Sequence, residues 1–205
     1  MATMDIRQIM LIAAGYVLGL AVISALHPAP LLVSLLIAVT LPTAAAANYK
    51  IFQRLGRRRN GDADPTSWVA VREIGFRISL FNIALHLLIL GSLTGLLGAE
   101  LIVPARLVVV FFGLLLIGIG NLLPRTRPNL AVGIRTPLTL ENRDAWIGVH
   151  RVAGSAAVAF GMVIVIAGTF LRNPTMPQVI SAAAWTTLAI LVATYRRHSR
   201  RRSAL

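Results

Sequence analysis

The chain has 205 residues, of which 57% are hydrophobic and only 13% charged, and it contains no cysteine. This composition is too apolar and too poor in charge for a soluble globule of this size, so we expect a lipid bilayer to be its solvent. The lack of cysteine excludes disulfides, thiolate metal sites and cysteine nucleophiles. The formal net charge of +13 would suggest nucleic acid on a soluble domain, but membrane topology explains it without a direct nucleic-acid partner.

Apolar runs free of Asp, Glu, Lys and Arg recur along the chain. A helix rises about 1.5 Å per residue and needs roughly 20 residues to cross a hydrocarbon core of about 30 Å. The runs do not alternate as the strands of a membrane barrel would. The sequence therefore predicts an all-α, single-domain integral-membrane protein, a compact bundle of six transmembrane helices at residues 9–26, 31–47, 78–97, 107–123, 152–171 and 179–195.

Lys and Arg gather on one side of this predicted topology. The connections 48–77 and 124–151 and the C-terminal tail hold most of them. By the positive-inside rule this side is cytoplasmic. We therefore expect a multi-pass protein of the bacterial cytoplasmic (inner or plasma) membrane, with both termini and both long loops in the cytoplasm. The first apolar run is longer than the core of a usual signal peptide, so we interpret it as a retained span.

The first long connection combines a turn with the start of a helix. Residues 60–65 read Asn-Gly-Asp-Ala-Asp-Pro and predict a solvated turn. Thr66 or Ser67 is expected to cap the helix that follows. Glu73 lies four residues before Arg77, a spacing that favours an exposed ion pair.

The third predicted span carries a polar stripe, Ser79, Asn82 and His86, at positions i, i+3 and i+7. An ionisable group inside a membrane is costly and is a functional hypothesis by default. One hypothesis is a proton-linked carrier that uses His86. The other is a neutral, hydrogen-bonded packing residue. All seven carboxylates lie outside the spans, which disfavours ion-coupled transport.

The segment 120–154 is polar, rich in proline and arginine, and lies between the fourth and fifth spans. Pro124 is expected to end the fourth helix, Pro128 and Asn129 to make a second turn, and Gly133 to permit an unusual backbone angle. The next helix is expected to start at Pro137 with Thr136 as its cap. In the alternative reading Thr139 is the cap.

The end of this segment is expected to be a helix that runs into the fifth span. Arg143, Trp146 and His150 lie on one side of it, and Trp146 suits the membrane interface. Glu141 and Asp144 are interpreted as helix-start residues. In the fifth span, glycines at 154, 161 and 168 are seven residues apart, so one face should let a neighbouring backbone approach closely.

Three explanations compete for the segment 120–154. The first is a tightly structured re-entrant or interfacial loop, and the second is a surface for a protein or peptide that uses Arg135, Trp146, His150 and Arg151. The third is a pocket for an anionic ligand, in which the arginines converge on a phosphate, namely Arg125, Arg127, Arg135, Arg143 and Arg151. Elsewhere the chain lacks the common hydrolase, phosphate-loop and metalloprotease motifs, and its four histidines have no metal-ligand spacing. We therefore expect no enzymatic activity, no cofactor and no metal.

The motif in this segment resembles the SdpI family of bacterial integral-membrane immunity proteins. The predicted binding surface consists of Asn121, Pro124, Arg125, Pro128, Asn129, Gly133, Arg135, Thr136, Pro137, Thr139, Trp146, His150 and Arg151. The resemblance implies immunity, that is, resistance to a secreted membrane-active peptide toxin. It also implies signal transduction in which a cytoplasmic transcriptional repressor is held at the membrane. The alternative is a small membrane enzyme or transporter that handles an anionic lipid or lipid-linked phosphate.

Overall fold

The computed structural model of the protein describes residues 6–26, 39, 42–52, 65–93, 102–171 and 175–203. The described residues form helices and one structured loop, with no strand among them. The elements are α1 (Ile6–Leu26), α3 (Pro65–Leu93), α4 (Ile102–Leu122), the 3₁₀ helix η2 (Leu123–Arg125), α5 (Pro137–Glu141), α6 (Arg143–Phe170) and α7 (Thr175–Ser203). Residues 42–52 are helical as well. The predicted all-helical architecture is confirmed for this part of the chain.

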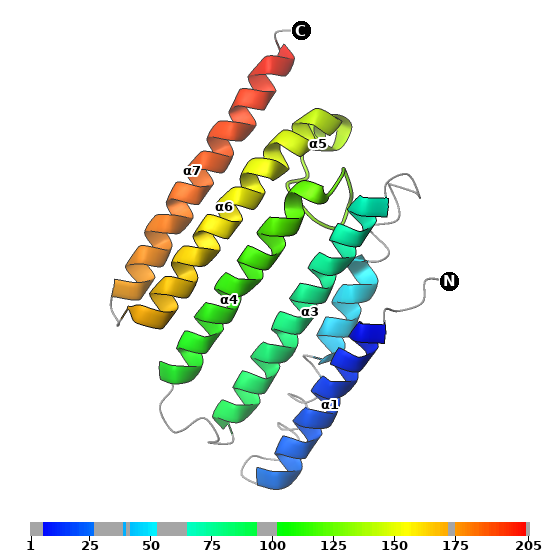
Figure 1. The fold of residues 1–205 in the computed structure, drawn as a ribbon, viewed down its shortest axis with the longest axis vertical. Helices are drawn as coiled ribbons and strands as arrows, with labels where there is room; N and C mark the ends of the chain where they lie inside the picture. The colour runs from blue at the N-terminus through cyan, green and yellow to red at the C-terminus, as the bar shows by residue number, and fades with distance from the viewer. Residues whose placement is uncertain are drawn as a thin grey trace.

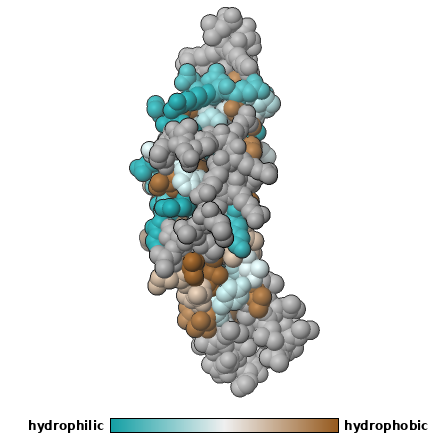
Figure 2. All heavy atoms as spheres, turned by 90° about the vertical axis from the view of Figure 1, so that its right-hand side faces the viewer, coloured by the Kyte–Doolittle hydropathy of each residue, from teal (hydrophilic) through white to brown (hydrophobic). Residues whose placement is uncertain are grey.

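The long helices lie side by side in a row, in the order α7, α6, α4, α3 and α1 (Figure 1). At one end of the row α4 ends and α6 begins, and α3 begins and α7 ends there too (Figure 1). We call this the loop end. Toward it, the described residues in Figure 2 are mostly hydrophilic, whereas hydrophobic residues are more frequent further down the helices.

Three helices among the described residues are long and apolar enough to cross a membrane, namely Thr66–Ser92, Arg106–Arg125 and Arg143–Phe170. They correspond to the predicted third, fourth and fifth spans. Shorter apolar helices at Ile9–Gly19 and Ile180–Ala193 coincide with the predicted first and sixth spans. Most of the predicted second span, 31–47, lies outside the described residues. The count of six spans and the side on which the termini lie stay predictions.

Helices α4 and α6 approach each other through facing glycines. A Cβ atom on Gly113 would lie 2.8 Å from the carbonyl oxygen of Gly161, and one on Gly161 would lie 2.6 Å from that of Gly113. Gly120 and Gly154 form the same reciprocal contact, at 2.7 and 2.6 Å. The predicted close approach along the fifth span is confirmed. Its partner is the glycine face of α4, which brings the ends of both helices together at the loop end.

The start of α3 differs from the expected one. The helix begins at Pro65, so neither Thr66 nor Ser67 is its cap. Proline is well suited to the first turn of a helix, because it lacks an N–H group that would have no partner there. The hydroxyl of Ser67 is instead buried and accepts a hydrogen bond from the backbone N–H of Arg127 at 2.8 Å. Ser67 therefore ties the segment after α4 to α3.

The expected pair between Glu73 and Arg77 does not form. Glu73 accepts a hydrogen bond from Arg7 of α1 at 2.7 Å, and Arg77 donates to the backbone carbonyl of Gly118 on α4 at 2.9 Å. Helix packing brings these partners within reach. Both side chains therefore link α3 to a neighbouring helix instead of to each other.

The polar stripe of α3 splits into different environments. Ser79 is buried, and its hydroxyl donates to the carbonyl of Gly75 at 3.0 Å and lies 3.3 Å from that of Ala45. Asn82 is half-buried. His86 is fully buried, and neither of its ring nitrogens bonds to any described residue. The described residues therefore provide no hydrogen bond for the packing role that was one of the two hypotheses for His86. The other hypothesis, a proton-linked carrier, stays a prediction.

Candidate functional site

The chain turns sharply where α4 ends at Leu122 and η2 continues to Arg125. Pro124 lies within η2, as expected of a residue that ends the regular helix. Thr126 follows it, fully buried, and its hydroxyl donates to the carbonyl of Leu123 at 2.7 Å. This side chain closes the turn and directs residues 127–136 back over the loop end. We call residues 126–142 the motif loop.

Asn129 organises the first half of the motif loop. Its side-chain oxygen accepts hydrogen bonds from the backbone N–H groups of Ala131 at 2.9 Å and Val132 at 2.8 Å. Its side-chain nitrogen donates to the carbonyl of Arg127 at 2.8 Å. Asn129 is fully buried, so these bonds satisfy backbone groups that would otherwise be costly to bury. The predicted turn at this position is confirmed.

Gly133 and His150 meet at the centre of the motif loop. Gly133 has a φ of +115°, and a Cβ atom there would lie 2.2 Å from Nε2 of His150. That nitrogen accepts the backbone N–H of Ile134 at 2.9 Å, and Nδ1 of His150 lies 2.8 Å from the carbonyl of Trp146. A nitrogen that accepts carries no proton, so the imidazole is neutral and Nδ1 is the donor.

Trp146 connects the two ends of the motif loop. Its ring stacks on that of His150, with centroids 3.9 Å apart and planes 15° apart. Its indole N–H donates to the backbone carbonyl of Thr126 at 3.1 Å. Trp146 and His150 are both fully buried. They therefore form the internal support of the loop, and the ring of Trp146 faces the inside of the protein.

A capping box starts α5. The N–H of Thr139 donates to the hydroxyl of Thr136 at 3.3 Å, and the N–H of Thr136 donates to the hydroxyl of Thr139 at 3.0 Å. Of the two predicted helix starts, the one with Thr136 as cap and Pro137 in the first turn is correct. Thr139 is fully buried, and its hydroxyl also donates to the carbonyl of Ile134 at 2.7 Å.

Asn142 starts α6. Its side-chain oxygen accepts the N–H groups of Asp144 at 2.9 Å and Ala145 at 3.0 Å. Asp144 lies in the first turn, as predicted for an acid near the positive end of a helix dipole. Glu141 is the last residue of α5, so its interpretation as a helix-start residue is wrong. Asn142 was not among the predicted caps, although an asparagine just before an acidic first turn is a recognisable signal.

The motif residues divide by exposure. Asn129, Thr139, Trp146 and His150 are buried, and Pro124, Arg127, Pro128 and Thr136 are half-buried. The exposed ones are Asn121, Arg125, Gly133, Arg135, Pro137, Arg143 and Arg151. We call Arg125, Arg135, Arg143 and Arg151 the loop arginines. Four uncharged side chains therefore lie inside and the loop arginines outside, while Arg127 is half-buried. The guanidinium of Arg135 also donates back to the carbonyl of Leu130. A binding role for these residues stays a prediction.

Sequence comparison gives one match. Residues 125–195 match the SdpI/YfhL protein family. Searches of the curated proteins and of the solved structures found no match. The matched region starts at Arg125 and covers the motif loop, α6 and most of α7. The resemblance inferred from the motif is therefore confirmed for residues 125–195, and the match is consistent with membership of the SdpI family.

Proposed function

We propose that this protein is a membrane immunity protein that protects its cell from a secreted, membrane-active peptide toxin. In this proposal the loop end faces the cytoplasm of a bacterial cell, and the loop arginines form the working surface. A cytoplasmic transcriptional repressor is the partner that this surface holds at the membrane when toxin is present. The observation that carries the proposal is the family match over residues 125–195.

The arrangement of the motif loop supports a role in protein recognition. Arginine is enriched in protein interfaces, where its planar guanidinium forms paired hydrogen bonds with carboxylates. The backbone that carries Arg135 is held by hydrogen bonds to the buried side chains of Asn129, His150 and Thr139. A surface that is already ordered loses little conformational entropy on binding. We therefore expect the partner to present an acidic patch, whose carboxylates complement the charge of the loop arginines.

A survival assay in toxin-sensitive bacteria tests the proposal. Cells that express the wild-type chain are expected to survive the toxin, whereas a variant with Arg135→Ala, Arg143→Ala and Arg151→Ala is expected to lose most of this protection. The three side chains are exposed, so membrane expression should be unchanged. Arg196→Ala is the matched control, because Arg196 is also exposed but lies on α7. Equal survival of wild type, triple variant and empty-vector cells would refute the immunity role.

A labelling experiment tests the proposed orientation. The chain has no cysteine, so Arg135→Cys creates a single reactive site on an exposed residue of the motif loop. A membrane-impermeant maleimide should label this site in opened cells and leave it unlabelled in intact ones. Labelling in intact cells would place the motif loop outside the cytoplasm and exclude repressor binding there.

A further inference from the structure

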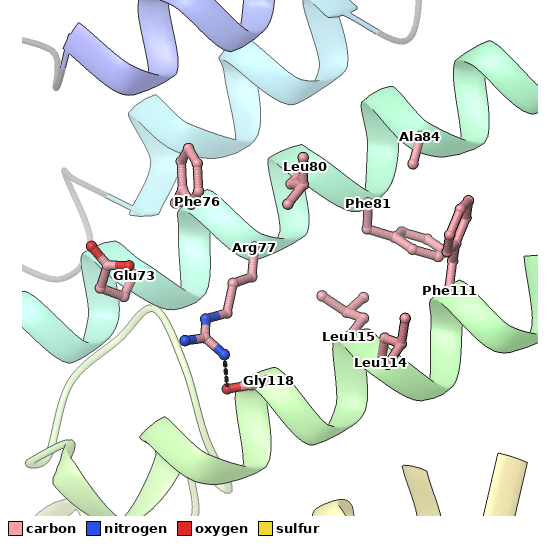
Figure 3. Close-up of a pocket in the computed structure, with 10 residues that line it drawn as sticks. All are labelled: Glu73, Phe76, Arg77, Leu80, Phe81, Ala84, Phe111, Leu114, Leu115 and Gly118. Atoms are coloured by element: carbon pink, nitrogen blue, oxygen red, sulfur yellow. Dashed lines mark hydrogen bonds between the residues drawn. The ribbon is translucent and has the colours of Figure 1, made fainter. Parts of the chain in front are cut away.

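A groove with one polar end lies between α3 and α4, and none of its lining residues belongs to the motif loop. Its volume is about 560 Å³, within the range of small-molecule sites. Phe76, Leu80, Phe81, Ala84, Phe111, Leu114 and Leu115 supply its apolar walls, and Glu73, Arg77 and Gly118 line its other end (Figure 3). Leu80 and Leu114 are 46% and 51% exposed, so the groove opens to the surroundings of the bundle.

The polarity of the groove matches that of a lipid in a membrane. Arg77 lies nearer the start of α3 than Ala84, and Gly118 lies near the end of α4, so the polar end points toward the loop end. The apolar part extends from Arg77 to Ala84, which is about 10 Å at the rise of an α-helix. A phospholipid whose headgroup lies at the loop end would therefore lay an acyl chain along Phe81 and Leu115 (Figure 3).

Arg77 is fixed in position yet keeps donors for a ligand. One nitrogen, Nη1, donates to the carbonyl of Gly118 at 2.9 Å, and it is the only one of its nitrogens bonded to a described residue. A guanidinium has five N–H donors, so others are left for a phosphate. The site depends on glycine at 118, because a Cβ atom there would lie 2.7 Å from Nη1 of Arg77.

The carboxylate of Glu73, at the same end of the groove, does not cancel the positive charge of Arg77. Glu73 forms an ion pair with Arg7 at 2.7 Å, and the guanidinium of Arg7 lies 5.3 Å from the centroid of the Phe76 ring. With Glu73 paired to Arg7, the guanidinium of Arg77 leaves the polar end with a net positive charge. This charge complements the single negative charge of a phosphodiester, and it disfavours a purely neutral occupant.

We propose that the groove between α3 and α4 binds one anionic phospholipid, with its phosphate on Arg77 and an acyl chain along the apolar walls. Lipid tails are as apolar as leucine, so filling the walls gives little preference over the surrounding bilayer. The guanidinium of Arg77 matches the geometry of a phosphate. Phosphatidylcholine carries the same phosphodiester but cancels its charge with an ammonium group, so selectivity for an anionic lipid must come from the net positive charge at the polar end. This site is separate from the loop arginines and does not depend on the proposed immunity role.

Native mass spectrometry of the full chain tests the proposal. The protein is reconstituted in phosphatidylcholine bilayers that contain a minor fraction of phosphatidylglycerol, and the lipid retained on release is measured. We expect the wild type to retain phosphatidylglycerol selectively, and Arg77→Ala to reduce this retention about tenfold, as the loss of a charged hydrogen bond implies. Arg106→Ala is the matched control, because Arg106 lies on α4 outside the groove and likewise donates to a backbone carbonyl of another segment, that of Leu171, at 3.1 Å.

A second variant keeps the test informative if Arg77→Ala fails to fold. Ala84→Phe fills the apolar end of the groove and leaves the hydrogen bond to Gly118 intact. It should lower phosphatidylglycerol retention while the protein stays monodisperse. Equal retention of both lipids by the wild type would overturn the proposal, as would equal losses in Arg77→Ala and Arg106→Ala. A peptide adduct in place of the lipid would overturn it as well.

Discussion

Two fully buried histidines lie in very different surroundings. In the motif loop, His150 uses both ring nitrogens, one to accept the N–H of Ile134 and one to donate to the carbonyl of Trp146. In α3, neither ring nitrogen of His86 bonds to a described residue. A buried polar group that is paired holds its surroundings in one arrangement, whereas an unpaired one costs stability. Burial alone therefore does not say what a histidine does, and the two sites should respond differently to substitution.

The largest effect is expected for Gly133→Ala. The added methyl group would lie 2.2 Å from Nε2 of His150, and the backbone φ of +115° disfavours alanine. We expect a loss of about 3 kcal/mol or more, because strain adds to the broken bond with Ile134. Thermal unfolding in detergent measures it. Gly75→Ala is the control, since its Cβ atom would lie 3.3 Å from the side chain of Phe52. Similar melting of both variants would refute the lock between Gly133 and His150.

His150→Leu is expected to cost about 2 to 3 kcal/mol, because the N–H of Ile134 loses its acceptor and the carbonyl of Trp146 loses its buried contact with the ring. Hydrogen exchange of the amides in residues 130–139 should accelerate in this variant. The amides of α4 should not change, since their bonds lie within the helix. Unchanged exchange at Ile134 would contradict the assigned role of the ring.

Thr139→Val tests the capping box that holds the second half of the loop. The variant keeps the side-chain shape but removes the hydroxyl that contacts Thr136 and Ile134, at an expected cost of about 1 to 2 kcal/mol. Thr169→Val is the control, because the hydroxyl of Thr169 is exposed and bonds only within α6. Its melting temperature should stay close to that of the wild type, and a shift as large as that of Thr139→Val would argue against the box.

The smallest effect is expected for His86→Leu. Replacing a buried ring that bonds to no described residue by an apolar side chain removes a desolvation cost, so stability should stay the same or rise by up to about 1 kcal/mol. Thermal unfolding of His86→Leu and His150→Leu under the same conditions measures the difference in stability between the two variants. A loss comparable to that of His150→Leu would mean that His86 has a partner outside the described residues. Lost toxin protection at full stability would show that His86 has a role beyond packing.

Local rules predicted much of the helical framework. Pro124, the Thr136 cap and the glycine stripe of α6 each act through backbone geometry that a short stretch of sequence specifies. The run of apolar residues likewise located α4 and α6, since their cores contain no charge. These features depend on neighbours along the chain, so the sequence alone was sufficient for them.

Contacts between distant segments could not be predicted in this way. Ser67 was expected to cap its own helix and instead binds the backbone of Arg127, 60 positions away. Trp146 and His150 were placed on a surface, but the motif loop folds over both rings. Helix periodicity gives the direction of a side chain and not what covers it. The groove between α3 and α4 also escaped notice, because it exists only where two helices pack.

The two glycine contacts between α4 and α6 also limit how these helices can move relative to each other. Carbonyl oxygens press on the facing glycines at two points, Gly113 with Gly161 and Gly120 with Gly154. If one helix slid along the other, side chains such as Val158 would collide with the backbone of the facing helix. The contacts therefore fix the axial position of α4 relative to α6. We therefore expect a displacement of residues 126–142 to move α4 and α6 together, because sliding between the two helices is sterically blocked.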